Sequence, residues 1–359
     1  MSVAMLCEQL VKSGNNISVY VTTANGPHEL EVIPNQTVTV DGVSVTYFKR
    51  ITKDHSHFSP ALLKAVWKNC KAYNVVHVHA WWNLVSVLSC LIAVIRGVPV
   101  LVSTRGTLSP YSFQNKNQGI KSIIHNLLGK PVLKCCHIHA TSPRESDSVN
   151  CIITPKSTTI IPNFVKLPSL HSSSQTAISS PIKLIFFSRI EEKKGLDILL
   201  NALAIVNVPY HLTVAGDGNE QYVERLKSLA IINGIAEKIT WAGFINEDKF
   251  KILQQHDLFI LPSYDENFGN AVIESLSVGT PVLISREVGL ADYVSKNNLG
   301  WLCKTTAASV AESIDKIVFK QSELLSIRKS APNIIYNDFS TDSLVEKYIG
   351  LYDKISKQH

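Results

Sequence analysis

The sequence predicts an α/β protein of two domains, on three observations. Its 359 residues exceed the size at which one hydrophobic core usually stops growing, and 45% of them are hydrophobic, enough for two cores. Short β-branched runs alternate with longer helical patterns, which is typical of parallel sheets joined by crossover helices. A polar, Ser-rich stretch between Pro168 and Pro181 is expected to be an exposed linker.

The elements follow this division. The first half is expected to begin with a helix over residues 1–11 and to continue with strands at 17–22, 75–79, 98–103, 136–141 and 157–161. The second half is expected to contain strands at 182–188, 210–216, 239–243, 258–262 and 281–285. Apolar and aromatic side chains at helical spacing predict a final helix over 339–355, namely Leu344, Tyr348, Leu351 and Tyr352. The expected domains are residues 1–167 and 182–338, with a linker at 168–181 and a terminal helix at 339–359.

The composition favours a protein of the reducing cytoplasm. The longest apolar stretch, Leu84 to Ile95, has 12 residues, and a membrane-spanning helix needs about 20. The seven cysteines form no Cys-x-x-Cys pair, and we expect no cleavable signal sequence at the start of the chain. Disulfides are rare in that compartment, and a reducing cytoplasm is therefore the interpretation that the cysteines favour.

Two carboxylates, Glu266 and Glu274, bracket a stretch that is expected to run from a loop into a helix. The helix is expected over Ala271 to Val278, and Gly269 allows the backbone before it to approach a ligand closely. A helix N-terminus presents unpaired N–H groups, so the turn from Phe268 to Asn270 suits an anion or sugar hydroxyls. The alternative is that both acids are ordinary solvated residues at a helix end.

Four motifs occur in a fixed order around these acids. They are Phe187 to Leu200, Leu212 to Gly218, Pro262-Ser263 with the two Glu, and Gly279-Thr280-Pro281-Val282. In this order and spacing the chain resembles the retaining glycosyltransferases of family 4, also called group 1, over nearly its whole length. The resemblance implies the GT-B fold, in which two Rossmann-like domains face each other across a cleft and a C-terminal helix packs back across the domains.

The resemblance also implies roles for residues of the second half. Arg189 and Lys194 match the positions that contact the diphosphate of a nucleotide-sugar donor. Cations there stabilise the charge that develops as the diphosphate leaves. The neighbouring Lys193 is expected to be a solvated loop charge. Glu266 is expected to orient the donor sugar, and Glu274 to accept hydrogen bonds from the ribose.

Further residues are expected to line the nucleotide. Gly243 and Phe244 match the nucleobase side, where an exposed aromatic ring can pack against the base; packing of Phe244 in the core is the alternative. Phe268, Gly269 and Asn270 are expected at the donor through their turn.

The acceptor half offers two candidates. His79 ends an expected strand where family members often carry a histidine near the sugar, and it is preferred over His77; a structural histidine bound to backbone is the alternative. Arg105 stands where many members carry His-Gly, and it is expected to bind the donor phosphate or an acidic acceptor. Asn163 is expected to be a hinge residue.

No bound metal and no cofactor besides the donor substrate is expected. The chain contains no Asp-x-Asp, the pair with which many sugar-nucleotide transferases hold a divalent cation. His77 and His79 share one face of a strand, but no third ligand is evident. Fixed cations are expected to take the place of the metal.

A basic amphipathic helix is expected to face the acceptor, and it suits an anionic bilayer surface or, alternatively, is a solvated helix face. Its basic residues are Lys116, Lys121, His125, Lys130 and Lys134. Nucleic acid is not indicated, because these residues are not interleaved with exposed stacking aromatics.

One departure from the family concerns the start of the chain. Members begin with a strand and a glycine-rich turn, whereas Met1 to Val11 already match the helix that follows them. Either the start codon is assigned too late, which we favour because the donor residues are intact, or the chain is a truncated copy.

Together these observations predict a retaining glycosyltransferase that moves a sugar from a nucleoside diphosphate donor to a hydroxyl of a glycan or lipid-linked acceptor. Surface polysaccharide assembly and a place at the inner face of the cytoplasmic membrane follow from the resemblance. Two alternatives remain: an epimerase of sugar nucleotides, which needs no acceptor, and a truncated protein that binds a nucleotide sugar without catalysis.

Overall fold

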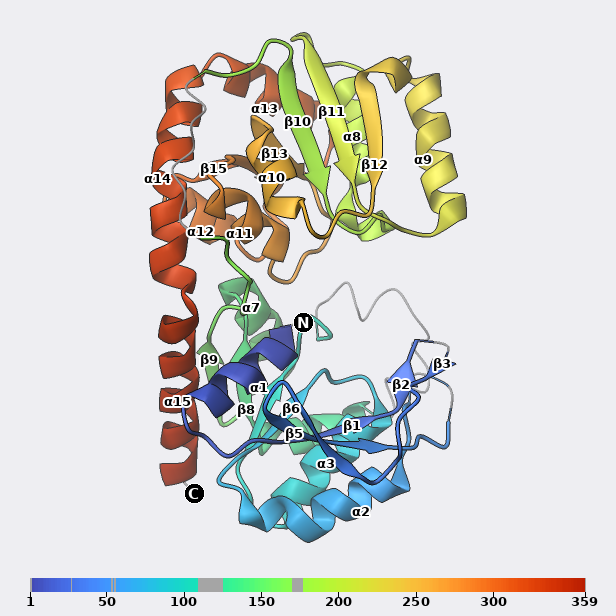
Figure 1. Ribbon diagram of the computed structural model, residues 1–359, viewed down its shortest axis with the longest axis vertical. Coiled ribbons are helices and arrows are strands. Elements are labelled where there is room, and N and C mark those ends of the chain that lie inside the picture. The colour runs from blue at the N-terminus through green and yellow to red at the C-terminus, as the bar shows by residue number, and fades with distance from the viewer. Residues whose placement is uncertain are drawn as a thin grey trace. The chain divides into compact units, whose positions relative to one another are not determined.

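The computed structural model, drawn as a ribbon in Figure 1, describes residues 2–26, 28–52, 54, 56–108, 125–169 and 177–358. The chain divides into two compact units. Unit 1 consists of Met1–Phe164 together with Thr341–His359, and unit 2 is Val165–Ser340. Each unit is an α/β structure with parallel strands, as predicted.

Unit 2 is built on a six-stranded sheet in which every pair of neighbours is parallel. The strands lie in the order β12 (Ile239–Gly243), β11 (Tyr210–Ala215), β10 (Ile182–Phe187), β13 (Leu258–Leu261), β14 (Val282–Ser285) and β15 (Gly300–Cys303). The strand order reverses between β10 and β13, as in doubly wound sheets, and ligands bind such sheets at the carboxyl ends of the strands beside that point.

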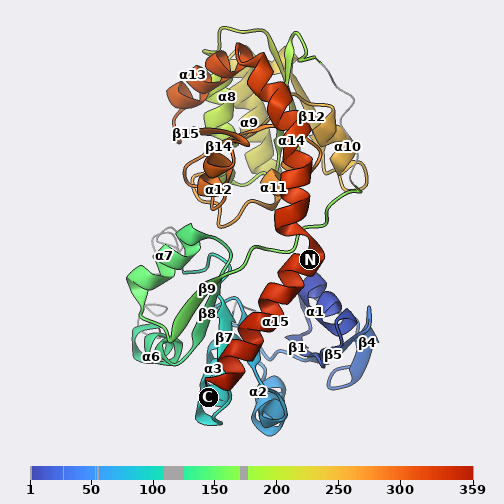
Figure 2. The same cartoon turned by 90° about the vertical axis from the view of Figure 1, so that its left-hand side faces the viewer.

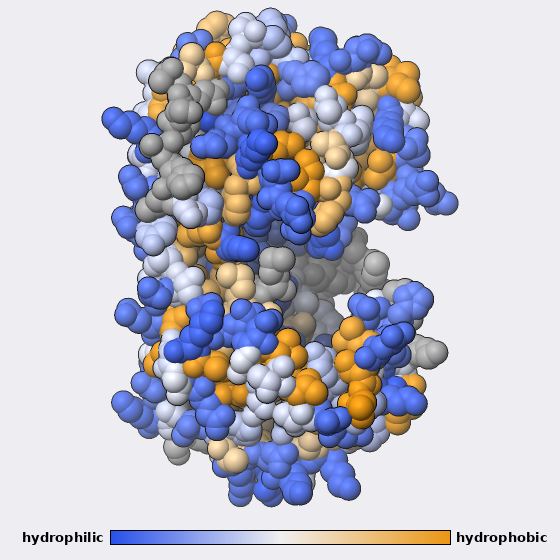
Figure 3. Space-filling view, in the orientation of Figure 1, coloured by the Kyte–Doolittle hydropathy of each residue, from blue (hydrophilic) through white to orange (hydrophobic). Residues whose placement is uncertain are grey.

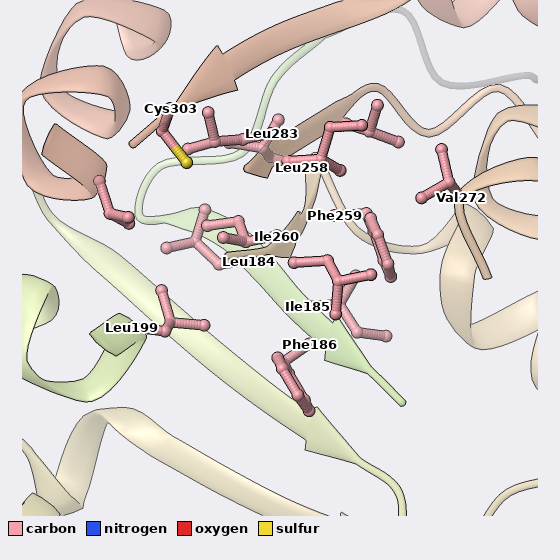
Figure 4. Close-up of a cluster of buried hydrophobic side chains, with 14 of the residues drawn as sticks. Leu184, Ile185, Phe186, Leu199, Leu258, Phe259, Ile260, Val272, Leu283 and Cys303 are labelled. Atoms are coloured by element: carbon pink, nitrogen blue, oxygen red, sulfur yellow. The ribbon is translucent and has the colours of Figure 1, made fainter. Parts of the chain in front are cut away.

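Helices lie between the strands of unit 2, and two more follow its last strand, β15. They are η3 (Glu192–Lys194), α8 (Leu196–Leu203), α9 (Glu220–Ile232), η4 (Ala236–Lys238), α10 (Lys249–Gln254), α11 (Asn270–Ser277), α12 (Ala291–Lys296), α13 (Ala307–Val318) and α14 (Gln321–Phe339). Central strands of a parallel sheet are buried on both faces, which explains their continuous apolar runs. Figure 4 shows Ile185 and Phe186 of β10 with Phe259 of β13 in this core, and all three are fully buried.

Unit 1 contains two larger sheets. One has the order β1 (Ser18–Thr22), β5 (Val43–Phe48) and β4 (Thr37–Val40); the other is parallel, with the order β6 (Val76–His79), β7 (Val100–Ser103), β8 (His137–Ala140) and β9 (Ser157–Ile160). A small hairpin pairs β2 (Ala24–Asn25) with β3 (His28–Glu29). The helices are α1 (Ser2–Lys12), α2 (Pro60–Asn69), η1 (Cys70–Ala72), α3 (Leu84–Ile95), η2 (His125–Gly129), α6 (Lys130–Lys134), α7 (Pro143–Ile152) and α15 (Thr341–Lys357).

Local sequence explains where several helices start. Ser59 and Ser142 are the N-caps of α2 and α7, and each is followed by a proline at the first helical position. The serine hydroxyl accepts a hydrogen bond from a free N–H of the first turn, and proline lacks the N–H that would go unpaired there.

Strands β1 and β6 belong to separate sheets. Strand β1 pairs with β5 and β6 pairs with β7, and no described strand pairs with the other edge of either. Residues Val19 to Thr22 are only half-buried, although their β-branched and aromatic composition suits a sheet interior. Helices α2 and α3 connect the two sheets through a shared apolar cluster that includes Leu62 and Val85.

The C-terminal helix α15 belongs to unit 1. Its buried stripe of Leu344, Tyr348 and Leu351 packs with Leu6 and Leu10 of α1. Figure 2 shows α15 in front of unit 1, with β7, β8 and β9 to one side and β1, β4 and β5 to the other. The predicted helix began two residues early, because residue 339 is the end of α14.

Two predictions concern membranes: that the chain has no membrane-spanning helix, and that a basic helix suits an anionic bilayer surface. Hydrophilic residues predominate on the face drawn in Figure 3, with apolar ones between them. None of the helices in the described part of the chain is long and apolar enough to cross a bilayer. Residues 116–124 of the predicted basic helix, with Lys116 and Lys121, lie outside the described residues; His125 begins η2, and Lys130 and Lys134 belong to α6.

Candidate active site

The predicted donor motifs of unit 2 meet beside the point where the strand order reverses. The loop after β10 contacts the loop after β13: the Tyr264 N–H donates to the Lys193 carbonyl oxygen at 2.8 Å. A Cβ on Gly195, whose φ is +70°, would lie 2.2 Å from the Pro262 carbonyl oxygen, so only glycine permits this approach. Motifs about 70 residues apart in sequence thus form one site.

Lys194 and Glu266 form an ion pair at the centre of this site, between Nζ and Oε2. Their side chains are 9% and 17% exposed. An ammonium carries three N–H donors, so contact with Glu266 leaves Lys194 able to bind phosphate oxygens as well. The two residues that were predicted to act on the donor are therefore neighbours.

The backbone of Glu266 is held by the segment after β14. The Gly289 N–H donates to the Glu266 carbonyl oxygen at 2.7 Å, and the Glu266 N–H donates to the Glu287 carbonyl oxygen at 3.2 Å. Because both peptide groups of Glu266 are fixed, its carboxylate is presented from a defined position. These supporting residues were not predicted, since nothing in the local sequence links residue 266 to residues 287–289.

Arg189, which was predicted to contact the donor diphosphate, is paired with an acidic side chain of its own loop. Its guanidinium pairs with Glu191 at 2.6 Å, and its side chain is 71% exposed. Lys193, expected to be a solvated charge, lies 3.7 Å from the same carboxylate. An exposed pair of this kind contributes little stability and leaves the guanidinium free to change partner.

Helix α11 begins at Asn270, directly after Gly269, whose φ is +99°. Its first N–H groups carry the partial positive charge of a helix N-terminus. The Phe268 ring is buried, with its centroid 6.2 Å from that of Phe339, so Phe268 can reach a ligand only through its backbone.

Glu274 lies one turn into α11 and pairs with Lys249 of α10 at 2.6 Å. Both side chains are about 15% exposed. The bond involves Oε1 only, so the carboxylate keeps acceptor capacity for a ribose hydroxyl. Lys249 was not predicted, because it belongs to none of the four motifs.

Gly243 is the last residue of β12, and Phe244 follows it. Gly243 accepts a hydrogen bond from the Gly216 N–H at 2.8 Å. The Phe244 side chain is exposed, at 73%, so the alternative that it packs in the core is wrong. An exposed ring at this strand end is available to stack on a planar group.

Unit 1 carries a second polar cluster, at the carboxyl ends of β6, β7 and β8. His77 binds Tyr352 through Nδ1 at 2.8 Å and Ser103 through Nε2 at 2.7 Å. The Ser103 hydroxyl reaches His139 Nδ1 at 2.7 Å, and His139 Nε2 donates to the Ile161 carbonyl oxygen at 2.8 Å. This is a directed chain through neutral imidazoles, and it attaches α15 to the sheet.

His79 lies beside His77, with ring centroids 4.1 Å apart, but it is not part of that chain. Its Nδ1 is buried and has no hydrogen-bond partner among the described residues. Burial lowers the pKa of His79 well below its ordinary value, and the charges of Arg105 and His139 lower it further. His79 is therefore neutral near pH 7.

Two residues in this region have left-handed backbones although neither is glycine. Ala80, after β6, has φ +65°, and Arg105, after β7, has φ +54°. Such conformations cost about 1–3 kcal/mol each and gather at functional sites. Arg105 donates through Nη1 to Asn163 Oδ1, so Asn163 supports a site side chain.

Two family descriptions match the chain: "Glycosyltransferase Family 4" over residues 1–167 and "Glycosyl transferases group 1" over residues 171–334. The chain belongs to the group 1 glycosyltransferases. This confirms the resemblance found in the sequence.

Comparisons with individual proteins agree with this family. An uncharacterized glycosyltransferase of Methanocaldococcus jannaschii, MJ1607, is 26% identical over 173 residues, covering 47% of this chain and 44% of that protein. The lipopolysaccharide core biosynthesis glycosyltransferase LpsE of Rhizobium meliloti is 26% identical over 196 residues, covering 54% and 56%. The chain thus spans about half the length of the curated relatives it matches.

Among solved structures, Anabaena HepE in complex with UDP superposes on this group 1 glycosyltransferase with a TM-score of 0.75. The two chains are 18% identical, and the match covers 98% of this chain and 96% of HepE. The predicted GT-B fold is confirmed.

Proposed function

We propose that this protein transfers a sugar, with retention of configuration, from a nucleoside diphosphate sugar to a hydroxyl of a glycan or lipid-linked acceptor. The observation that carries the proposal is the Lys194–Glu266 pair at the carboxyl ends of β10 and β13, beside the N-terminus of α11. Cations and helix N–H groups at that place suit a diphosphate, and acidic side chains suit sugar hydroxyls. HepE, with which the fold aligns, was solved with UDP and UDP-glucose.

In the proposed reaction the bond from the anomeric carbon to the diphosphate oxygen breaks while the acceptor oxygen bonds to that carbon on the same face. The acceptor's proton passes to a phosphate oxygen of the departing diphosphate. Lys194 stabilises the charge that develops on the diphosphate, and Arg189 adds to it once its guanidinium leaves Glu191. Glu266 orients the sugar, Glu274 holds the ribose, and Phe244 stacks on the base.

On the acceptor side we propose that His79 and Arg105 contact the reacting sugars or an acidic group beside them. We further propose that no divalent metal is needed, because fixed cations occupy the diphosphate side. LpsE is named for lipopolysaccharide core biosynthesis, and on that basis we propose surface polysaccharide assembly, at the inner membrane face, as the setting.

The test is to incubate the enzyme with UDP-, GDP- or ADP-sugars and glycan acceptors in EDTA and to assign the product's anomeric configuration by NMR. The proposal predicts one donor class, a retained configuration and at least 100-fold slower turnover in Glu266→Ala. An inverted product would overturn retention, and full turnover in Glu266→Ala would overturn the role of Glu266. Conversion of the donor without any acceptor would identify an epimerase instead.

A further inference from the structure

Arg105 is held in an unfavourable backbone conformation by residues on both sides of it. It has φ +54°, in the left-handed region that a long side chain rarely adopts. Its neighbours Thr104 and Gly106 both donate to the same carboxylate oxygen, Glu145 Oε1, at 2.6 and 2.7 Å. One buried acceptor therefore fixes the residue before Arg105 and the residue after it.

The other oxygen of Glu145 is bound to a different segment. Oε2 accepts from the Thr141 N–H at 2.7 Å and from the Thr141 hydroxyl at 2.8 Å. Glu145 is 4% exposed, so each of its oxygens is buried and saturated by two donors. Four donors and a place in the first turn of α7 explain how a carboxylate is tolerated in the interior.

Capping of α7 does not require this arrangement. In a capping box an acidic side chain in the first turn bonds to the backbone just before its own helix, which the Thr141 bonds achieve. The bonds to Thr104 and Gly106 cross instead to the loop after a neighbouring strand, β7. They attach that loop to the first turn of α7.

The loop presents Arg105 to the histidine cluster. Ser103, at the end of β7, is opposite His79 of β6 in the sheet register. The positive charge of Arg105 contributes to lowering the pKa of His77, His79 and His139, after burial. Arg105 thus lies close to the carboxyl ends of three strands; the residue as a whole is half-buried, and its Nε and Nη2 atoms are buried.

We propose that Glu145 is a positioning residue for catalysis: it locks the Thr104–Gly106 loop so that the Arg105 guanidinium binds an anionic oxygen of a substrate. The anionic oxygen belongs to the donor diphosphate or to an acidic acceptor. This inference rests on the function proposed above.

Two matched variants test the proposal. Thr104→Val and Thr141→Val each remove one buried hydroxyl donor from Glu145, but only the first releases the Arg105 loop. The expected result is that Thr104→Val lowers turnover of the preferred sugar nucleotide about tenfold, while Thr141→Val stays within twofold of the parent. Equal activity losses in both variants would overturn the proposal, because they would indicate a structural role only.

A double-mutant cycle shows whether Glu145 acts through Arg105. Glu145→Ala and Arg105→Ala are expected to have similar effects alone, and Glu145→Ala is expected to add less than threefold in the Arg105→Ala background. Multiplicative effects would contradict the proposal.

The KM values of these variants identify the bound group. A raised KM for the donor would identify its phosphate as the bound group, and a raised KM for the acceptor alone would identify an acidic acceptor. If Glu145→Ala does not fold, Thr104→Val combined with Arg105→Ala completes the same cycle.

Crystal structures of the variants test the positioning role of Glu145 independently of the proposed glycosyl transfer. Crystal structures of the Thr104→Val and Thr141→Val variants are expected to show Arg105 displaced from Asn163 and from the left-handed region only in the first. That result would support the positioning role even if no donor were turned over. An unchanged Arg105 in Thr104→Val would overturn it.

Discussion

Lys194 and Glu266 are 72 residues apart in sequence and in contact in the fold. Sequence motifs identified both residues but not their contact, because an ion pair between two loops depends on the strand order that brings the loops together. The same limit applies to Lys249 and Glu145. Each binds a residue of the candidate site from another element, at sequence separations of 25 and about 40 residues. No local pattern reveals such a partner.

The adjacent lysines 193 and 194 offer a matched comparison. Lys194 is buried against Glu266, and Lys193 is 38% exposed beside Glu191. Lys194→Met is expected to lower donor turnover at least 100-fold, since it removes a fixed charge at the leaving diphosphate. Lys193→Met is expected to stay within twofold. Initial rates at saturating donor measure both; equal rates in the two variants would contradict the role of Lys194.

Lys249 is expected to act through Glu274. The ribose lies far from the bond that breaks, so Lys249→Met should raise the donor KM about three- to tenfold and leave kcat within threefold. Lys251→Met, which changes an exposed residue of the same helix α10, is the control. A fall in kcat without a change in KM would show that the pair serves chemistry rather than donor binding.

Helix α15 is attached to its sheet by a chain of neutral histidines. Burial lowers the pKa of His139 to about 4, and the pKa of His77 also lies well below its ordinary value. In the unfolded chain these groups titrate near pH 6.5. Below that pH the unfolded state binds more protons than the folded state, so stability falls as the pH decreases and is level above it.

The drop from pH 6.5 to 5 is expected to cost about 1.5 kcal/mol for His139, because its unfolded imidazole is half protonated at pH 6.5 and the slope approaches about 1.4 kcal/mol per pH unit only below that. His77 shifts stability in the same direction. Thermal unfolding by circular dichroism should therefore show a Tm that declines below pH 6.5. His139→Gln, which removes one of these titrating groups, should reduce the decline. A wild-type Tm that stays level from pH 7 to 5 would contradict this account.

The elements themselves were predictable to differing degrees. The strands around the donor site were predicted within one residue of their bounds, since parallel central strands are continuous apolar runs. Strand β15 was missed because it begins at Gly300, which has no side chain to contribute to a pattern. The β4–β5 hairpin was also missed, although Asp41-Gly42 between two β-branched runs is a strong turn signal, and both residues have positive φ.

For the molecule as a whole, the family and the fold could be predicted from the sequence, because the four motifs keep their order even where sequence identity is low. The candidate site residues of unit 1 were harder to predict from the sequence than those of unit 2. His79 and Arg105 were chosen by their expected positions, and His79 was preferred over His77 because it lies nearer the strand end. In the structure His77 is hydrogen-bonded to Ser103 and Tyr352. The left-handed backbone conformations of Ala80 and Arg105 arise from the packing of their loops. Neither alanine nor arginine favours a positive φ, so the sequence could not predict them.

We propose that unit 2 binds a nucleoside diphosphate sugar through Lys194. Isothermal titration of the whole protein with UDP-, GDP- and ADP-glucose in EDTA tests this binding most directly. One donor is expected to bind with 1:1 stoichiometry, about tenfold more weakly to Lys194→Met and equally well to Lys193→Met. Failure of all three donors to bind, or equal binding to both lysine variants, would contradict the claim.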